Sequence, residues 1–173
     1  MRALTFWKEI IVDRENALEA LVNLLEEKGI RYCVIGGQAV NAYVEPLVSL
    51  DLDLVVAIDQ LDQVESLLSA LYKVKHFPHS LNVFLPESDV RVQIQTDQRY
   101  ASFPDRAIQG NVLGMILPVA SLEDVLRGKV WAALDPTRRP SKRQKDLADV
   151  ARLLETYPEL RAQTPEDILK RLI

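Results

Sequence analysis

Residues 32–56, YCVIGGQAVNAYVEPLVSLDLDLVV, join two apolar segments through a pair of glycines and place two aspartates in the second segment. The alternation in LDLDLVVAI, which then becomes continuously apolar, predicts a strand with one deeply buried end. Because side chains alternate along a strand, Asp51 and Asp53 share one face, with Cα atoms roughly 6.5–7 Å apart. Two carboxylates are therefore expected close together on a strand that is otherwise buried.

Two carboxylates at this separation can converge on one hard cation, and without it their repulsion and desolvation would be costly. Mg²⁺ typically takes one or two carboxylates together with substrate phosphates and water. Taken alone, an Asp-x-Asp is more typical of the solvent-facing side of a half-buried strand. The context favours the metal site, because a possible phosphate cradle precedes it in the sequence.

That cradle is the glycine pair Gly36-Gly37, which ends one strand and begins a helix. Backbone N–H groups and the positive helix end can face a phosphate there. Taken alone, the pair could be a tight strand-to-helix turn. Together with the Ser49 hydroxyl and the two carboxylates, it predicts a phosphate cradle opposite a metal site, which suits nucleotidyl or phosphoryl transfer.

Outward from this stretch, apolar periodicity and turn residues predict the remaining elements. Before residue 80 we expect a helix over 13–28, a strand at 31–35, a short helix after the glycines and a helix over 60–74 capped by Asp59. Two strands are expected within 80–97, joined at 86–88, and a strand or hairpin around 110–114. The remaining elements are expected to be helices over 121–134, over 144–157 and from Pro165. This order predicts an α+β fold, a small mixed β-sheet flanked by helices with a helical C-terminal third. Residues 1–120 are expected to form an α/β core, and 121–173 C-terminal helices packed on it in a single compact domain.

Composition excludes several classes of protein. The net charge is −4, which argues against nucleic-acid binding by bulk electrostatics, and no stretch approaches the 18 apolar residues of a membrane span. The N-terminus has no small-residue cleavage site, so no secretory signal is expected. The lone Cys33 is expected to be a buried small hydrophobe, and the setting cytoplasmic. One segment is strongly basic: RRPSKRQK, residues 138–145, is either a solvated loop or a local phosphate site.

The stretch GGQAVNAYVEPLVSLDLDLVV resembles the first motif of the nucleotidyltransferase superfamily, which has the DNA polymerase beta-like fold. It is most similar to the AbiEii-type toxin and minimal nucleotidyltransferase group. SLEDVLRGKVWAAL resembles that group's helix with an Asp before a Lys, here Asp124 and Lys129. RQKDLADVARLL resembles its closing motif, carried by Arg143, Lys145, Asp146 and Asp149. The resemblance covers roughly residues 15 to 157.

The resemblance implies a role for each matching residue. Asp51 and Asp53 would hold Mg²⁺ or Mn²⁺, Lys129 would neutralise phosphate charge, and Asp146 would point at the active site, paired with Lys129. Nucleotide-binding residues would be Gly36, Gly37, Gln38, Ser49, Gln93 and Arg143. From the residues alone, Lys129 could be a surface lysine, Asp146 a carboxylate favoured by a helix dipole, and Arg143 part of the basic loop. Asp149 could be either a site residue or a helix charge.

One position departs from the family. A third carboxylate is expected in a segment like VRVDIQ, but the chain has VRVQIQ, with Gln93 at that place. An amide is a weak Mg²⁺ ligand and no useful base. Asp89 and Asp97 share the strand face, but each would be displaced by roughly 13 Å. The domain would then work with two carboxylates and one metal, bind nucleotide without turnover, or serve a protein partner.

The resemblance thus implies an enzyme that transfers NMP from an NTP to an acceptor with the help of Mg²⁺. Its family makes RNA, including tRNA, an acceptor to consider, and an adjacent antitoxin protein a partner; no membrane association is expected. The alternative is a catalytically degenerate module that binds a nucleotide or a protein, with Gln93 in place of the third carboxylate.

Overall fold

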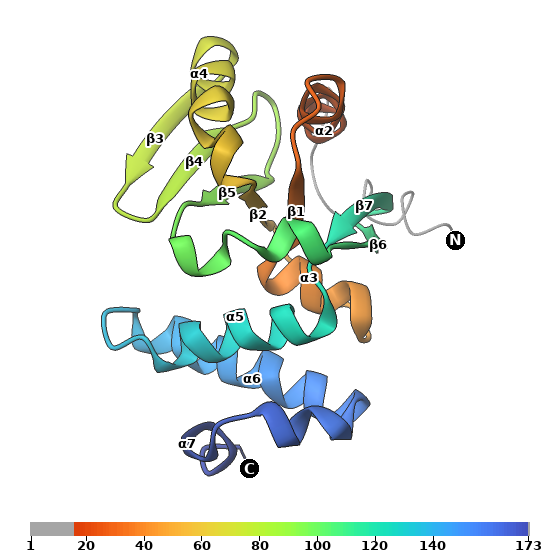
Figure 1. Cartoon of the computed structure of the whole chain (residues 1–173), viewed down its shortest axis with the longest axis vertical. Coiled ribbons are helices and arrows are strands. Elements are labelled where there is room, and N and C mark those ends of the chain that lie inside the picture. The colour runs from red at the N-terminus through yellow and green to blue at the C-terminus, as the bar shows by residue number, and fades with distance from the viewer. Residues whose placement is uncertain (1–15, 173) are drawn as a thin grey trace.

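Residues 16–172 are described by the structure, a computed structural model of the chain, and their centre is a mixed sheet (Figure 1). The spatial order of its seven strands is β3-β4-β5-β2-β1-β7-β6. The strands are β1 (Tyr32–Ile35), β2 (Asp51–Val56), β3 (Lys73–Phe77), β4 (Ser80–Phe84), β5 (Arg91–Gln95), β6 (Ile108–Val112) and β7 (Met115–Val119). The predicted α+β class is confirmed: the described strands all precede residue 120, and the described elements after it are helical.

The helices occupy two regions of the molecule. They are α2 (Ala17–Glu27), α3 (Gly36–Tyr43), α4 (Leu61–Leu71), α5 (Leu122–Leu134), α6 (Pro140–Thr156) and α7 (Glu166–Leu169), with short 3₁₀ turns η1 (Ile58–Gln60), η2 (Gln98–Tyr100), η3 (Phe103–Arg106) and η4 (Pro158–Gln163). In Figure 1 the sheet, α2 and α4 fill the upper half and α5, α6 and α7 the lower half. Helix α3 lies between the halves, because it contacts β1, β2, α5 and α6. Within 16–172, no helix combines the length and apolar character needed to cross a membrane.

Strand β2 lies at the centre of the sheet, antiparallel to β1 and parallel to β5. Its Leu52 and Leu54 are fully buried on one face, whereas Asp51 and Asp53 are half-buried on the other. The alternation predicted for this strand is therefore present. The C-terminal residues Val55 and Val56 are both buried, as the apolar end of the segment predicted.

The sheet half of the core is apolar, and Cys33 of β1 is fully buried in it. Burial raises the pKa of its thiol to about 12, so this cysteine is a small core residue, as expected, and no nucleophile. Where the sheet meets α5, the rings of Tyr100, Phe103 and Trp131 pack together, with centroids 5.2–5.9 Å apart.

Several predicted boundaries differ from the structure. The helix expected over 60–74 ends at Leu71, because the following residues pair with β4 as strand β3, which sequence periodicity missed. Asp59 does not cap that helix; it forms an ion pair with Arg31, and the N-cap is Gln60. The first helix is described from Ala17, so its expected start at 13 and the absence of a secretory signal lie outside the described residues.

Candidate active site

The glycine turn connects β1 to α3 and lies directly against Asp53. Gly36 has φ +69°, a left-handed conformation that favours glycine, and it is the first residue of α3. A Cβ atom at this position would overlap the Asp53 carboxylate oxygen Oδ2. At Gly37, by contrast, an added Cβ would meet no atom within 4 Å. The two glycines therefore differ in what their positions require. Only at position 36 does the close approach of a carboxylate require glycine.

Replacing Gly36 by alanine is expected to destabilise the protein by roughly 1–3 kcal/mol, through backbone strain and the forced displacement of Asp53. The matched variant Gly37→Ala adds a methyl group in open space and is expected to change stability by less than about 1 kcal/mol. Urea denaturation of both variants measures the difference. Equal losses for the two variants would contradict the assigned role of Gly36.

The loop between α3 and β2 is held by side chains of α3. Gln38 is buried, and its Nε2 donates a hydrogen bond to the Ser49 carbonyl oxygen at 3.0 Å. Asn41 both donates to and accepts from the backbone of Leu47, at 2.7 and 3.0 Å. The Ser49 hydroxyl accepts a hydrogen bond from the backbone N–H of Asp51 at 3.3 Å. Gln38 thus shapes the approach to β2, and its amide already has a partner.

The two carboxylates of β2 differ in environment. Asp51 pairs with Arg91 of β5, with Oδ1 2.7 Å from Nε. Burial raises the pKa of Asp53 to about 6; Asp51 also raises it, and the cationic Lys129, Arg138 and Lys142 work against this. A carboxyl group with such a raised pKa gains from a nearby cation, because a cation stabilises its ionised form.

Replacing Asp53 by asparagine is expected to stabilise the metal-free protein at pH 7 by about 1–3 kcal/mol. Ionising Asp53 costs more in the folded state, where its pKa is about 6, than in the unfolded chain, where it is 3.8. The wild type therefore loses stability as pH rises between these values, whereas the variant does not, and the two should converge below about pH 4.

Urea denaturation in EDTA from pH 4 to pH 8 measures this difference. Glu155→Gln, which removes one exposed carboxylate from α6, controls for net charge. The expectation would be refuted if the variant were less stable than the wild type at pH 7, or if the difference in their free energies of unfolding did not change with pH.

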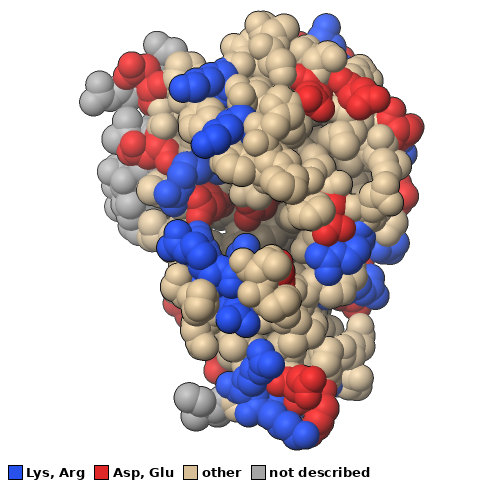
Figure 2. Space-filling model, turned by 90° about the vertical axis from the view of Figure 1, so that its left-hand side faces the viewer, with Lys and Arg blue, Asp and Glu red and all other residues tan. Residues whose placement is uncertain are grey.

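One cleft between the sheet and the C-terminal helices brings most of these groups together. Its sheet side includes Gly36, Gly37, Ser49, Asp51, Asp53 and Gln93, and its helical side includes Asp124, Lys129, Arg138, Lys142, Lys145 and Asp146. Figure 2 shows a hollow at mid-height with acidic side chains at its floor and Lys and Arg around it. Carboxylates and cations thus face one another across the cleft, an arrangement suited to a metal-bound polyphosphate.

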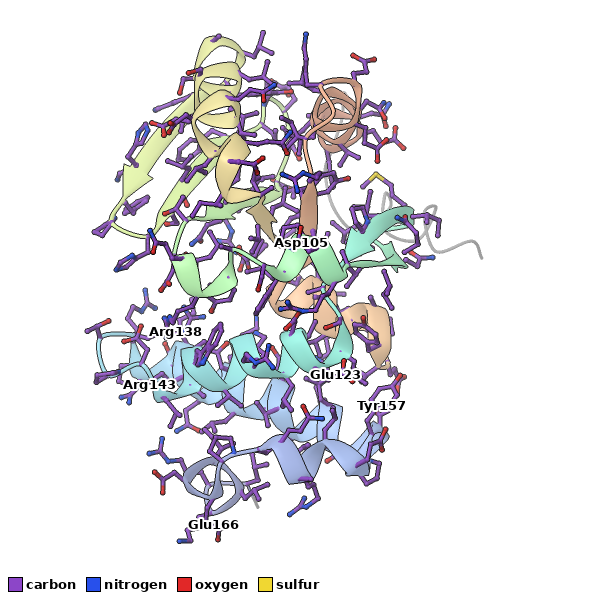
Figure 3. The ribbon with its side chains drawn as sticks, in the orientation of Figure 1. Asp105, Glu123, Arg138, Arg143, Tyr157 and Glu166 are labelled. Carbon is purple, nitrogen blue, oxygen red and sulfur yellow. The ribbon has the colours of Figure 1, made fainter. Side chains whose placement is uncertain are left out.

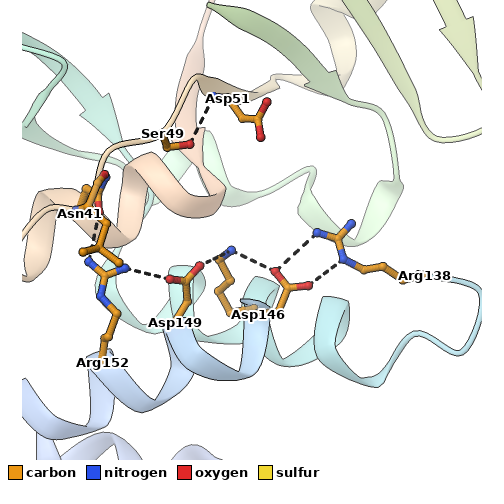
Figure 4. A network of polar contacts seen from close by, with 9 residues as sticks. Asn41, Ser49, Asp51, Arg138, Asp146, Asp149 and Arg152 are labelled. Carbon is orange, nitrogen blue, oxygen red and sulfur yellow. Dashed lines mark hydrogen bonds and ion pairs between the residues drawn. The ribbon is translucent and has the colours of Figure 1, made fainter. Parts of the chain in front are cut away.

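A buried ion-pair chain supports the helical side of the cleft (Figure 4). Lys129 Nζ lies 3.1 Å from Asp146 Oδ1 and 2.7 Å from Asp149 Oδ2, and all three side chains are at least 90% buried. Burial lowers the pKa of Lys129, but Asp149 and Asp146 outweigh it and raise the pKa, so the lysine stays charged. Arg138 Nε contacts Asp146 Oδ2 at 2.7 Å, and Arg152 Nη1 contacts Asp149 Oδ1 at 2.8 Å.

Arg152 extends this chain to the loop before β2. Its Nη2 donates to Asn41 Oδ1 at 3.1 Å and to the Glu45 carbonyl oxygen at 2.6 Å. Asn41 in turn holds the backbone of Leu47. The network therefore connects α5, α6 and the segment that leads to Asp51.

Two residues predicted for the nucleotide site do not line this cleft. Gln38 is turned to the Ser49 carbonyl, as described above. Arg143 lines a separate pocket with Pro140, Leu147 and Arg171, and its buried Nε has no hydrogen-bond partner among the described residues. In Figure 3, Arg138 lies between α5 and the sheet, whereas Arg143 lies at the level of the α5–α6 pair.

Two cleft residues, Arg138 and Lys142, were indicated only as part of the basic segment 138–145, whereas Lys145 also belongs to the closing motif. Helical spacing explains why Lys142 and Lys145 line the cleft and Arg143 does not. Positions 142, 145, 146 and 149 lie on one face of α6, and position 143 lies outside that face. Arg91 had no sequence signal, since its contact with Asp51 depends on the pairing of β2 with β5.

Asp124 also lines the cleft, but it is tied to Arg106 and Arg127, with its carboxylate oxygens 2.7–3.0 Å from guanidinium nitrogens. Its backbone N–H donates to Ser121 Oγ, the N-cap of α5. This residue is therefore a structural anchor for the start of α5.

Gln93 stands beside Asp53 in the sheet, at the neighbouring position of β5, and it lines the cleft. Asp97 is not a substitute, because it pairs with Arg99 and caps η2 beside a different pocket. Among residues 16–172, no group of three or more His, Cys, Asp or Glu side chains could hold a metal. Two carboxylates do fit Mg²⁺ that is bound jointly with substrate phosphates, but they do not form a cage that would hold the ion alone.

Comparison with known proteins gives one family match. Residues 20–172 match the model of the family described as nucleotidyl transferase AbiEii toxin, Type IV TA system. Among curated proteins, none matches the chain in sequence.

Three solved structures show the same fold. The chain is similar to the ANT(2″)-Ia complex with adenylyl-2″-tobramycin (TM-score 0.57, 14% identity, 84% of this chain and 95% of that chain). It is also similar to the lincomycin-bound lincosamide antibiotic adenylyltransferase LnuA (0.53, 16%, 80% and 97%) and to an antigenic nucleotidyltransferase-like protein from Paracoccidioides brasiliensis (0.52, 17%, 89% and 76%). At these identities the likeness concerns the fold alone.

Proposed function

Because the chain belongs to the AbiEii nucleotidyl transferase toxin family, we propose that it transfers a nucleoside monophosphate from an NTP to an acceptor hydroxyl. The observation that carries the proposal is the cleft, in which Asp51 and Asp53 face Arg138, Lys142 and Lys145. In the reaction, a bond forms between the acceptor oxygen and the α-phosphorus, the bond from that phosphorus to the bridging oxygen breaks, and pyrophosphate leaves. The acceptor hydroxyl gives its proton to water.

Asp51 and Asp53 are the residues that would hold Mg²⁺ or Mn²⁺ together with the triphosphate. When bound, such an ion neutralises phosphate charge and orients the phosphates for in-line displacement. The chain's own contribution is to place two carboxylates on one strand face, and to hold Asp53 against the glycine turn.

The remaining cleft residues are proposed to bind the triphosphate. Gly36 and Gly37 line the cleft at the start of α3, where backbone N–H groups and the helix dipole would favour an anion. Lys142 and Lys145 would pair with phosphate oxygens. Lys129 already has two carboxylate partners, so we propose that it keeps Asp146 in place, which in turn orients Arg138 toward the cleft.

The family description names a toxin–antitoxin system, so we propose an antitoxin protein as a partner and a cytoplasmic setting, where NTPs are present. We propose RNA, including tRNA, as the acceptor. The basic residues at the start of α6 support this, because they add positive charge at the cleft rim.

One observation favours a second function, namely nucleotide binding without transfer. Gln93 stands at the position of the third carboxylate, and Arg91 already neutralises Asp51. The comparisons add no support for this alternative.

The test is to incubate the protein with each α-³²P-labelled NTP, total RNA and MgCl₂, and to separate the RNA on a denaturing gel. Labelled RNA that requires the metal is expected. Calorimetry of NTP with and without Mg²⁺ accompanies the assay. Metal-dependent NTP binding without any labelled acceptor would favour the second function, and absence of NTP binding would exclude both.

A further inference from the structure

The sheet face that carries Asp51 and Asp53 continues without a break to the edge of the sheet. Strand pairing places successive residues side by side: Asp51, Arg91, Phe84 and Lys73 form one row, Asp53, Gln93, Asn82 and Lys75 a second, and Gln95, Ser80 and Phe77 a third. Directly paired residues share a face. Cationic and aromatic side chains of β3 and β4 therefore lie on the same face as the candidate metal ligands.

Helix α4 covers the opposite face of these strands. Leu81 and Val83 of β4 are buried, as are Val64 and Leu68 of α4, and His76 of β3 contacts Glu65 of the helix. The face with the lysines and phenylalanines is open instead. Phe84 is 47% exposed and Phe77 43%, and Lys73 and Lys75 are exposed.

A groove connects this open face with the candidate active site. It is lined by Asn82, Phe84, Ser88 and Arg91, and it shares Asp51, Asp53, Gln93 and Lys142 with the cleft. The side-chain oxygen Oδ1 of Asn82 is buried and has no hydrogen-bond partner among the residues that the structure describes. An unsatisfied acceptor of this kind is costly unless a ligand or water donates to it.

We propose that this face, which we call the β3–β5 face (Lys73, Lys75, Phe77, Asn82, Phe84 and Arg91), binds the single-stranded end of a nucleic-acid acceptor and leads it to Asp51 and Asp53. The proposal rests on the proposed function. Single strands bind to surfaces where exposed aromatic rings stack with bases and cations follow the backbone. Lys73 and Lys75 already lie over the rings of Phe84 and Phe77, with Nζ 5.6 and 5.1 Å from the ring centroids.

Protection of the sheet edge does not explain the whole face. Lysines on an edge strand prevent edge-to-edge association, but exposed phenylalanines beside them favour association. A protein strand added to the edge would use the backbone of β3 and would depend little on these side chains. The acidic Glu87 and Asp89 belong to the turn between β4 and β5 and lie outside the three rows.

The test measures binding of a fluorescein-labelled 12-nucleotide single-stranded RNA of mixed sequence by anisotropy, over a range of NaCl concentrations. Phe77→Ala with Phe84→Ala is expected to weaken binding about 10- to 1,000-fold. Lys73→Glu with Lys75→Glu is expected to weaken it and to reduce the slope of log K against log salt by at least about 1.4.

Matched controls come from distant surfaces. Ile108→Ala with Ile116→Ala removes two exposed apolar side chains from β6 and β7, the last two strands at the other end of the sheet, and Arg161→Glu with Lys170→Glu reverses two charges in the C-terminal segment. Both are expected to bind the RNA like the wild type. Calorimetry with NTP and Mg²⁺ shows whether each variant keeps an intact cleft.

The proposal is overturned if both face variants bind the RNA normally, if a duplex of the same sequence binds as tightly as the single strand, or if the wild type binds no RNA at 50 mM NaCl. Failure of the proposed function gives a different result: the wild type then binds the single strand through this face but transfers no label from NTP.

Discussion

Replacing Asp51 and Asp53 together by alanine is expected to reduce metal-dependent transfer of labelled NMP at least about 1,000-fold. Both side chains line the cleft from one face of β2, and among the described residues no third carboxylate is placed to hold a metal with them, since Asp124 and Asp146 of the same cleft are paired with basic side chains. Without them, Mg²⁺ has only substrate phosphates and water as ligands. NTP binding should then lose its dependence on Mg²⁺, because the basic side chains of Arg138, Lys142 and Lys145 remain opposite.

Gel analysis of RNA labelled from α-³²P NTP measures the transfer, and calorimetry measures the metal dependence. Asp97→Ala is the control. Asp97 lies just after β5 and was expected on the same face as Gln93, but it pairs with Arg99 outside the cleft. It should transfer label like the wild type. Substantial transfer by the double variant would overturn the assignment of the metal ligands, and a large loss in Asp97→Ala would identify a third carboxylate that moves into the site.

The second large effect is on stability. Lys129→Met is expected to lower the free energy of unfolding by about 3–5 kcal/mol, because it leaves the buried carboxylates of Asp146 and Asp149 without their shared cation. Methionine keeps most of the volume of lysine, so the loss reports charge and not a cavity. Urea denaturation at pH 7 measures it.

Two further variants test the cause of that loss. Lys129→Met with Asp149→Asn removes one negative charge together with the positive one, and it is expected to recover part of the stability, since the asparagine can still accept from Arg152. Lys145→Met, on the exposed part of the same cleft wall, should cost less than about 1 kcal/mol. If the Lys129 and Lys145 variants lose equally little, the buried ion-pair chain does not stabilise the helical half.

Local patterns in the sequence determined several features that the structure confirms. Period-two alternation placed Asp51 and Asp53 on one face of a strand, with Leu52 and Leu54 buried on the other. The strand-to-helix turn at Gly36 and the helix expected over 121–134, observed as α5, were also readable, because both depend on neighbouring residues only. These patterns, with the ordered motifs, also carried the resemblance to the AbiEii group that the family match confirms.

Other features were decided by tertiary structure. Residues 73 and 74 belong to the helix expected over 60–74, and pairing with β4 places them in strand β3 instead. Arg143 and Lys142 are neighbours in one basic segment, but the rotation of α6 against α5 directs only Lys142 into the cleft. Likewise, Arg91 and Gln93 meet Asp51 and Asp53 through the register of two strands some 40 positions apart.

The division has a physical reason. Backbone geometry repeats every two residues in a strand and every 3.6 in a helix, so a sequence determines by itself which side chains share a face. Strand register and helix rotation are selected by the burial of the whole core, to which residues far apart contribute together. The sequence alone therefore determined that the two carboxylates of β2 share one strand face and that a glycine turn begins α3. Only the tertiary structure decided which cations face these carboxylates, and that their sheet face continues to Phe84 and Lys73.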